Sequence, residues 1–233
     1  MNERTNEQLQ VPPHDCLAAN CGNRPIRSLN SPKTTSFPVP DSTPEWRQKV
    51  FGLDETHSTV SKLSRNASWF ARGCLRNDRR HGWWMVVAGQ TGCGKTHVAR
   101  RIHEFVGLRL VDAYHSGWLP DTKLDSPAFL RWDRVAEMDD DDWDATVDRW
   151  VMPTHLVVVD DVGAETDRYK SGVPKSRLKQ LLDICEHKWM FLTTNIGREE
   201  WEPTFGQRTA DRLKEAKYLS MFDVPSYRGH ARP

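Results

Sequence analysis

Hydrophobic and polar positions follow two different periods along the chain, and each period predicts one kind of element. Short continuous apolar runs, which are typical of strands buried on both faces of a sheet, occur at residues 84–88, 156–159 and 189–194. Two further stretches predict strands at residues 108–113 and 218–224. Helical spacing or composition predicts helices between these runs, at about residues 60–70, 95–106, 129–136, 143–150, 176–188 and 209–217.

This alternation of strands and helices predicts the α/β fold class, with a parallel sheet flanked by helices on both faces. The first 44 residues have a different texture: seven of the 14 prolines lie there, at 12, 13, 25, 32, 38, 40 and 44, and all 10 tryptophans come later. Such a segment buries too little apolar surface to offset the entropy cost of ordering it. We therefore expect a flexible tail at residues 1–44 and one domain at residues 45–233.

Bulk composition excludes some classes of protein and leaves others open. The formal net charge is +1, the sequence pI about 7.7 and the mean hydropathy −0.70, so any DNA contact requires a local basic patch. The apolar stretches are too short to span a bilayer, and the start of the sequence lacks the apolar core of a signal peptide. The five cysteines are scattered and do not indicate a disulfide framework. These features predict a cytoplasmic protein without a membrane partner.

One motif carries specific chemistry. Residues 89–96 fit the phosphate-loop pattern GxxxxGK[ST], and they lie between a predicted strand and a predicted helix. The glycines let backbone N–H groups point at phosphates, and the N-terminus of the following helix adds partial positive charge. Lys95 is predicted to neutralise the β- and γ-phosphates of ATP, and the Thr96 hydroxyl to bind Mg²⁺. The expected nucleotide-binding residues are Gly89, Gln90, Thr91, Gly92, Cys93, Gly94, Lys95, Thr96 and His97.

A second, acidic motif follows the apolar run at residues 156–159. Asp160 is expected at the C-terminal end of a buried strand, where its carboxylate can hold the magnesium ion together with Thr96. Asp161 follows directly and is predicted to orient and deprotonate the attacking water. The pair of carboxylates favours ATP hydrolysis over phosphoryl transfer to a metabolite, because a simple kinase does not need the second one here.

Further runs follow the phosphate loop in a fixed order. They are Asp-Asp-Val-Gly-Ala-Glu at residues 160–165, Leu-Thr-Thr-Asn at 192–195, Phe-Gly-Gln-Arg-Thr-Ala-Asp-Arg-Leu at 205–213 and Pro-Ser-Tyr-Arg at 225–228. In this order they resemble the Walker B segment, sensor 1, the G-x-R-x-x-D-R-L box and the closing S-Y-R of one family of AAA+ ATPases, the DnaC/IstB helicase loaders and transposition helpers. The resemblance covers roughly residues 46–230, and the ordered set is far more specific than any single motif.

The resemblance implies a P-loop NTPase fold with an AAA+ core, without a substantial C-terminal lid domain, and it implies roles for several residues. Asn195 would hydrogen-bond the γ-phosphate or the attacking water. Arg212 would be an arginine finger that enters the ATP site of a neighbouring subunit in a homo-oligomer, with Arg208 one helical turn away as an alternative. Arg228 would be the sensor 2 arginine, which reaches the γ-phosphate in cis.

The function implied by the resemblance is Mg²⁺-dependent ATP hydrolysis in DNA replication, by a protein that loads a replicative helicase onto single-stranded DNA as DnaC does. An IstB-like helper that presents target DNA to a transposase is the first alternative. A small-molecule P-loop kinase is an alternative from another class, and it would have no use for Arg212 in trans. A nucleotide-binding scaffold without hydrolysis is a third, because Asp161 stands where many AAA+ proteins have Glu.

A basic stretch precedes the first predicted strand. It contains the aromatic residues Trp69 and Phe70 and the basic residues Arg65, Arg72, Arg76, Arg79, Arg80 and His81. Cations bind the phosphates of single-stranded DNA, and aromatic rings stack on its bases. A solvated surface ahead of a core strand fits the same pattern, so both interpretations stay open.

Overall fold

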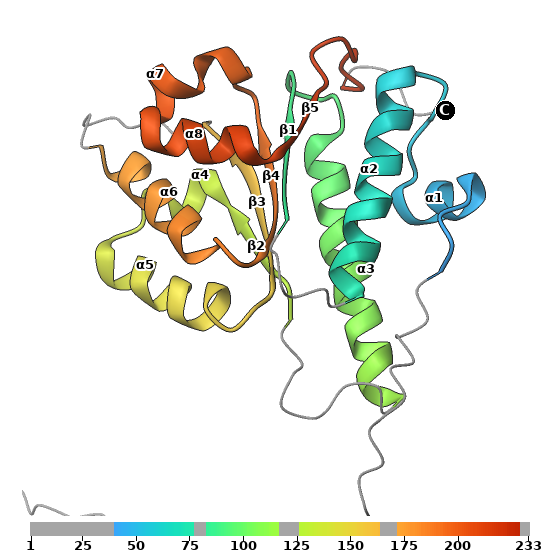
Figure 1. The fold of residues 1–233 in the computed structure, drawn as a ribbon, viewed down its shortest axis with the longest axis horizontal. Helices are drawn as coiled ribbons and strands as arrows, with labels where there is room; N and C mark the ends of the chain where they lie inside the picture. The colour runs from blue at the N-terminus through green and yellow to red at the C-terminus, as the bar shows by residue number, and fades with distance from the viewer. Residues whose placement is uncertain (1–39, 77–82, 117–125, 164–171, 229–233) are drawn as a thin grey trace, which may run out of the picture. The chain divides into compact units, whose positions relative to one another are not determined.

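Five parallel strands form a single sheet in the computed structural model, which describes residues 40–76, 83–116, 126–163 and 172–228. Their order is β2-β3-β4-β1-β5. The strands are β1 (Trp84–Ala88), β2 (Ala128–Arg131), β3 (Leu156–Val162), β4 (Trp189–Thr194) and β5 (Lys217–Ser220). Helices cover both faces of this sheet (Figure 1). The predicted fold class is therefore confirmed, whereas most of the expected tail lies outside the described residues.

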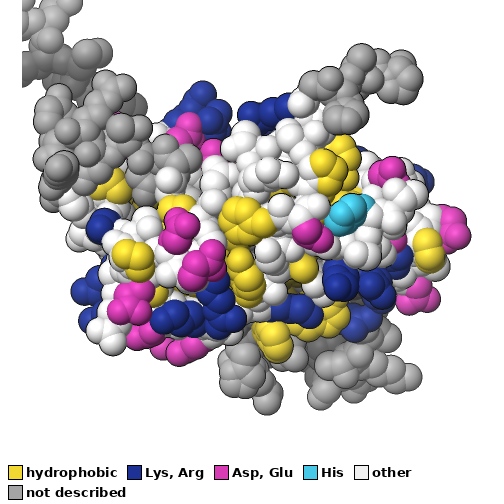
Figure 2. Space-filling view, turned by 90° about the horizontal axis from the view of Figure 1, so that it is seen from above, with side chains coloured by type: hydrophobic (Ala, Val, Ile, Leu, Met, Phe, Trp, Pro, Cys, Tyr) yellow, Lys and Arg dark blue, Asp and Glu magenta, His cyan; other side chains and the backbone are white. Residues whose placement is uncertain are grey.

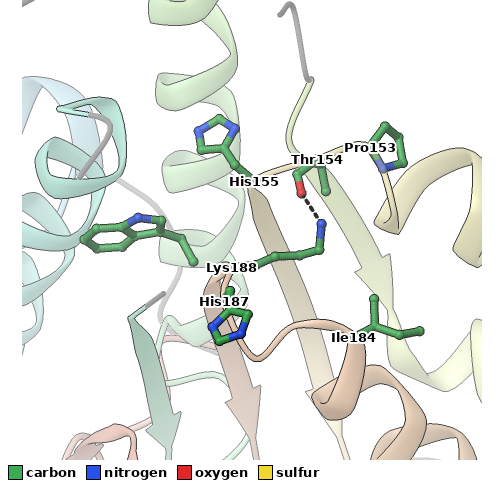
Figure 3. A pocket seen from close by; sticks show the side chains of 7 residues that line it. Pro153, Thr154, His155, Ile184, His187 and Lys188 are labelled. Carbon is green, nitrogen blue, oxygen red and sulfur yellow. Dashed lines mark hydrogen bonds between the residues drawn. The ribbon is translucent and has the colours of Figure 1, made fainter. Parts of the chain in front are cut away.

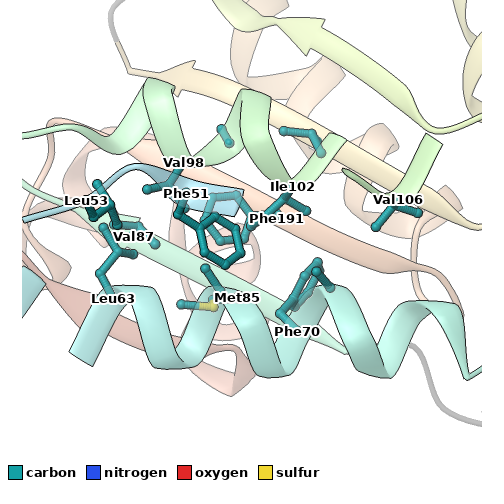
Figure 4. Close-up of a cluster of buried hydrophobic side chains, with 14 of the residues drawn as sticks. Phe51, Leu53, Leu63, Phe70, Met85, Val87, Val98, Ile102, Val106 and Phe191 are labelled. Atoms are coloured by element: carbon teal, nitrogen blue, oxygen red, sulfur yellow. The ribbon is translucent and has the colours of Figure 1, made fainter. Parts of the chain in front are cut away.

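One face of the sheet is covered by α1 (Pro44–Phe51), α2 (Ser58–Leu75) and α3 (Lys95–His115). Apolar residues of α2 recur at helical spacing and are buried from Val60 to Leu75, which confirms the helix predicted there. They pack with residues of α1, α3 and the central strands, among them Phe51, Ile102 and Phe191 (Figure 4). This layer supports the edge of the sheet from which the phosphate loop emerges.

The other face is covered by shorter elements (Figure 1). They are α4 (Trp132–Val135), α5 (Asp140–Thr146), the π-helix η2 (Val147–Val151), α6 (Val173–Ile184), the 3-10 helix η3 (Arg198–Glu200), α7 (Trp201–Phe205) and α8 (Gln207–Glu215). A second apolar cluster fills the space beneath them, with Trp132 and Trp201 fully buried. Within the described residues, which end at Arg228, no helix follows β5. None of the helices in these residues is long and apolar enough to cross a membrane.

The strand predicted at residues 108–113 is wrong, because α3 continues through it to His115. The apolar residues Ile102, Val106, Leu110 and Ala113 are spaced three or four apart and face the core, which is the pattern of one long helix. An ion pair of Arg109 with Asp112 at 3.1 Å adds the helical i,i+3 contact. Leu108, which made the segment look like a strand, is exposed.

The helix predicted at residues 129–136 is wrong in its first half. Residues 128–131 form β2, in which buried and half-buried positions alternate, and Leu130 lies opposite Val159 of β3. Strand pairing with the apolar β3 therefore outweighs the local helical pattern, and only α4 remains helical.

Candidate functional site

The predicted residues of the phosphate loop, the acidic motif and sensor 1 meet at one edge of the sheet, where the central strands end. β1 ends at Ala88, directly before the phosphate loop, while Asp160 and Asp161 lie near the end of β3 and Asn195 follows β4. Ligands of open α/β sheets bind at this carboxyl edge. In the view onto it, Lys and Arg side chains gather along one border, and hydrophobic side chains lie in the middle (Figure 2).

Lys95 is the buried cation of the site, with 5% of its surface exposed. Its ammonium group donates to the carbonyl oxygens of Gly89 at 2.7 Å and Gln90 at 3.0 Å, and to Oδ1 of Asn195 at 2.8 Å. Burial lowers the pKa of Lys95 from its ordinary value, while Cys93 and the two carboxylates of β3 act in the opposite direction. Neutral oxygen atoms thus hold the ammonium at the phosphate loop. Because none of these acceptors is charged, the ammonium can still pair with an anion.

Asn195 connects this lysine to the acidic strand. Its Nδ2 donates to Oδ1 of Asp161 at 2.9 Å, while its Oδ1 accepts from Lys95. The opposite orientation of the amide would direct its NH₂ group at the ammonium and its oxygen at the carboxylate, so only this one satisfies both neighbours. A chain of hydrogen bonds, Lys95–Asn195–Asp161, therefore crosses the ends of the three central strands.

Asp160 and Asp161 both lie within a break in the strand register, between Val159 and Val162. Asp160 is 3% exposed, and its Oδ1 accepts from the Thr193 hydroxyl at 2.7 Å; the same hydroxyl accepts from the Asp161 N–H at 2.9 Å. Asp161 has a φ of 67°, a left-handed conformation that Asp and Asn adopt more readily than most residues. Thr193 thus holds both acids in place. Thr193 belongs to the run that resembles sensor 1 and was given no role from the sequence, although the two Thr residues that end this otherwise apolar strand were the signal.

The residues proposed for magnesium fit that ion. Asp160 keeps one carboxylate oxygen that Thr193 does not occupy, and Thr96 lies in the first turn of α3. The described part of the chain contains no group of three or more His, Cys, Asp or Glu side chains that could hold a metal on its own. Magnesium commonly binds one or two protein carboxylates together with the phosphates of its nucleotide, so a sparse set of this kind is suitable.

The end of the described chain, residues 221–228, lies along the phosphate loop, and we call it the C-terminal segment. Two hydrogen bonds join the two, from Nε2 of Gln90 to the Val224 carbonyl at 2.6 Å and from the N–H of Tyr227 to the Gly92 carbonyl at 3.0 Å. A third, from the N–H of Met221 to the Ala88 carbonyl at 2.6 Å, joins the segment to the end of β1. Arg228, expected to act in cis, is therefore beside the loop of its own chain. Ser226 and Tyr227 contact the same loop and were given no role from the sequence.

Replacing Gly92 by Ala is expected to weaken ATP binding by about tenfold or more. Gly92 has a φ of +87°, and a Cβ there would collide with the Ser226 hydroxyl and lie 3.2 Å from Cγ of Arg228. The new methyl group therefore displaces the C-terminal segment. Isothermal titration with ATP measures the loss, and the additional replacement Ser226→Gly is expected to restore part of the affinity.

The matched control is Gly172→Ala. Gly172 has a similar φ of +74°, but a Cβ there meets nothing within 4 Å, so this variant carries the backbone strain without the collision. Its affinity for ATP should equal that of the wild type. Equal loss in both variants would show that a general effect on the fold, not contact with the C-terminal segment, lowers the affinity.

The loop after α1, residues 52–57, lies beside the first turn of α3 and near the C-terminal segment. The ring nitrogen Nε2 of His97 lies 2.5 Å from the Phe51 carbonyl oxygen. Arg47, almost fully buried, pairs with Glu55 at 2.9 Å, and hydrogen bonds from this guanidinium lower the pKa of Glu55 to about 2. Burial, with help from Asp54, raises the pKa of Tyr227. The ion pair with Arg47 thus holds this loop against α1, and the effect of Asp54 on Tyr227 shows that the loop lies near the C-terminal segment.

Arg212 and Arg208 lie elsewhere, on α8. Arg212 pairs with Asp183 of α6 at 2.6 Å with a quarter of its side chain exposed, and Arg208 approaches the same carboxylate at 3.9 Å with 65% exposed. Both ion pairs join α6 to α8, whereas the phosphate loop joins β1 to α3. The structure therefore brings neither arginine into the Lys95–Asn195–Asp161 cluster of its own chain. This placement is consistent with an arginine finger that acts in trans.

A cavity of about 280 Å³ opens at the opposite edge of the sheet, at the amino ends of β3 and β4 (Figure 3). It is lined by Pro153, Thr154, His155, Ile184, His187, Lys188 and Trp189. The Lys188 ammonium donates to the carbonyl oxygens of Thr154 at 2.6 Å and Met152 at 2.9 Å, so this cation is already engaged. None of the predicted site residues lines this cavity.

Comparisons with solved structures identify the fold. The structure of the DnaC helicase loader aligns with a TM-score of 0.55 at 15% identity, over 76% of this chain and 97% of that one. The DnaI structure aligns with a TM-score of 0.52 at 17% identity, over 77% and 94%. DnaA bound to AMPPCP and single-stranded DNA aligns with a TM-score of 0.50 at 15% identity, over 77% of this chain and 50% of that one.

Neither a family model nor a curated protein sequence matches the chain. At identities of 15–17%, the structural likenesses show the fold alone: this chain has the fold of the P-loop AAA+ domains. The resemblance to the DnaC type found in the sequence is confirmed at that level.

Proposed function

We propose that this chain is a Mg²⁺-dependent AAA+ ATPase that assembles through Arg212 and loads a replicative helicase onto single-stranded DNA. The observation that carries the ATPase is the hydrogen-bonded chain Lys95–Asn195–Asp161 at the carboxyl ends of the central strands. Phosphoryl transfer is catalysed mostly by positioning and by fixed charge, and this arrangement supplies a cation and a carboxylate on opposite sides of one amide.

Each residue then has a distinct task. Backbone N–H groups of the phosphate loop and the Lys95 ammonium bind the phosphates, in exchange for the carbonyl contacts that hold this ammonium. Asp161 orients the attacking water and takes its proton, and Asn195 fixes the position of that carboxylate. Magnesium, bound through Asp160 and Thr96, would neutralise charge on the β- and γ-phosphates. Arg228 contacts the γ-phosphate from the C-terminal segment.

The loader role rests on the fold and on the order of the motifs. DnaC and DnaI are matched over 97% and 94% of their structures, so the chain contains nearly all of the fold seen in them. The chain has the five motifs of the DnaC/IstB type in sequence order. These two observations support a switch in which ATP binding stabilises one assembly and hydrolysis releases it.

We expect the full chain, ATP and Mg²⁺ to form a stable complex with the replicative helicase of the same organism. Size-exclusion chromatography with light scattering measures its mass, and Lys95→Ala, which removes the phosphate-binding cation, should abolish ATP turnover and any ATP-dependent complex. Deletion of residues 1–39 tests whether the segment before α1 contributes to the partner interface.

Separate elution, with ATP turnover still stimulated by DNA, would overturn the loader role and favour a transposition helper. Turnover that depends neither on protein concentration nor on DNA would favour a small-molecule kinase. Absence of turnover in the wild-type chain would leave a nucleotide-binding scaffold, so each outcome selects one function.

A further inference from the structure

Helix α2 presents one basic stripe to solvent. Its exposed residues include Lys62, Arg65 and Trp69, and the exposed Arg76 caps its C-terminus. The half-buried Arg72 lies between Trp69 and Arg76. The steps of three, four, three and four residues place all five side chains on a single face of the helix. The opposite face is buried in the core, so α2 displays this stripe along most of its length.

Little negative charge offsets the stripe. The 18 residues of α2 include no Asp or Glu. Arg72 pairs with Asp41 at 3.4 Å, but the Asp41 side chain is 95% exposed, which makes this contact weak. Glu55 faces the start of α2 through Ser61 and Ser64, and its charge is already compensated by Arg47. Within the ranges that the structure describes, ion pairs involve neither Lys62, Arg65 nor Arg76.

Two exposed tryptophans lie on this stripe and beside it. The rings of Trp69 and Trp83 pack edge to face at 5.0 Å, with 45% and 46% of each residue exposed. Lys217, at the start of β5, places its ammonium 5.4 Å from the centre of the Trp69 ring. Trp132 and Trp201 are fully buried, whereas Trp150 is exposed elsewhere on the surface; Trp69 and Trp83 differ from it because their two exposed rings pack against each other.

The structure also corrects the sequence interpretation of this region. Phe70, expected to share the surface with Trp69, is fully buried against Trp189 and Phe191. Trp83, which was not part of the predicted stretch, takes its place. Arg79, Arg80 and His81 lie outside the described residues, and the surface stands without them.

We propose that the α2 stripe is the binding surface for single-stranded DNA, with Lys62, Arg65, Arg72 and Arg76 on phosphates and Trp69 and Trp83 on a base. The stripe is about 21 Å long, at 1.5 Å per helical residue, which is long enough to contact several successive phosphates. A duplex offers its phosphates but hides the faces of its bases, whereas a single strand offers both to a basic and aromatic surface. That the strand is DNA rests on the function proposed above.

The test is the anisotropy of a fluorescent dT20 strand titrated with the full chain in ATP and Mg²⁺. The double variant Arg65→Ala, Arg76→Ala should bind about tenfold more weakly and reduce the slope of log K against log salt by about 1.4, or 0.7 for each phosphate contact. Trp69→Ala should weaken binding by at least about fivefold. The matched control, Lys175→Ala, Lys179→Ala, removes the same charge from exposed positions of α6.

An equal loss in both double variants would overturn the proposal, because general electrostatic attraction would explain it. Equal affinity of the wild type for duplex and single-stranded DNA, with no effect of Trp69→Ala, would overturn it as well, and so would absence of binding. ATP turnover without DNA and the complex with the helicase are measured on the same proteins. If only the DNA surface is wrong, ATP turnover and the complex with the helicase stay intact. If the proposed function is wrong, turnover and the complex are absent, while the variants still differ from the wild type in their affinity for dT20.

Discussion

Replacing Asp161 by Asn is expected to reduce the rate of ATP hydrolysis by about two to three orders of magnitude, with ATP affinity almost unchanged. The amide keeps the size of the side chain but cannot accept the proton of the attacking water. Asn also tolerates the left-handed φ of 67°, so the backbone and its N–H bond to Thr193 remain. Steady-state turnover and the binding of a fluorescent ATP analogue measure the two effects separately.

Asp144→Asn is the matched control, because it removes one exposed carboxylate from α5, which covers the face of the sheet opposite to α3. Its turnover should equal that of the wild type. Unchanged turnover in Asp161→Asn would assign the water to another group and remove Asp161 from the chemistry. A large loss of ATP affinity instead would mean that Asp161 acts through Asn195 on the position of Lys95.

Residues that belong to contiguous motifs could be predicted from the sequence. Lys95, Asp160 and Asn195 each follow or end a strongly apolar strand, and parallel strands bring their carboxyl ends to one edge. The sequence therefore predicted which side chains would meet, although not that Asn195 would join Lys95 to Asp161. That connection depends on strand order, because β4 lies between β1 and β3.

The contacts of the C-terminal segment could not be predicted in this way. Gln90 and Val224 are 134 residues apart, and their hydrogen bond depends on how the chain leaves β5. Trp83 was missed for a similar reason: it precedes a strand in sequence and meets Trp69 only after α2 packs on the sheet. The length of α3 was underestimated because Leu108 and Val111 are apolar yet exposed, which local patterns read as a strand.

Replacing Arg212 by Ala is expected to lower ATP turnover by about 10³-fold, because an arginine finger stabilises charge that develops in the transition state. In the single chain, this guanidinium is held by Asp183 at 2.6 Å, away from the Lys95 cluster. Its action therefore requires release from Asp183 and entry into the site of a neighbouring subunit. Arg208, farther from the same carboxylate and more exposed, provides the matched variant on the same helix.

Mixing two inactive variants distinguishes action in trans from action in cis. Arg212→Ala keeps a complete Lys95–Asn195–Asp161 site, and Asp161→Asn keeps the arginine, so mixed oligomers contain some sites with both groups. If Arg212 acts in trans, turnover of the mixture should exceed the sum of the separate proteins and depend on protein concentration. Arg208→Ala mixed with Asp161→Asn should show no such gain. If Arg208→Ala is instead the variant that loses turnover and is rescued by mixing, the arginine finger is Arg208. If neither mixture gains activity, Arg212 contributes through its ion pair with Asp183. The variant Asp183→Ala should then reproduce the loss of turnover.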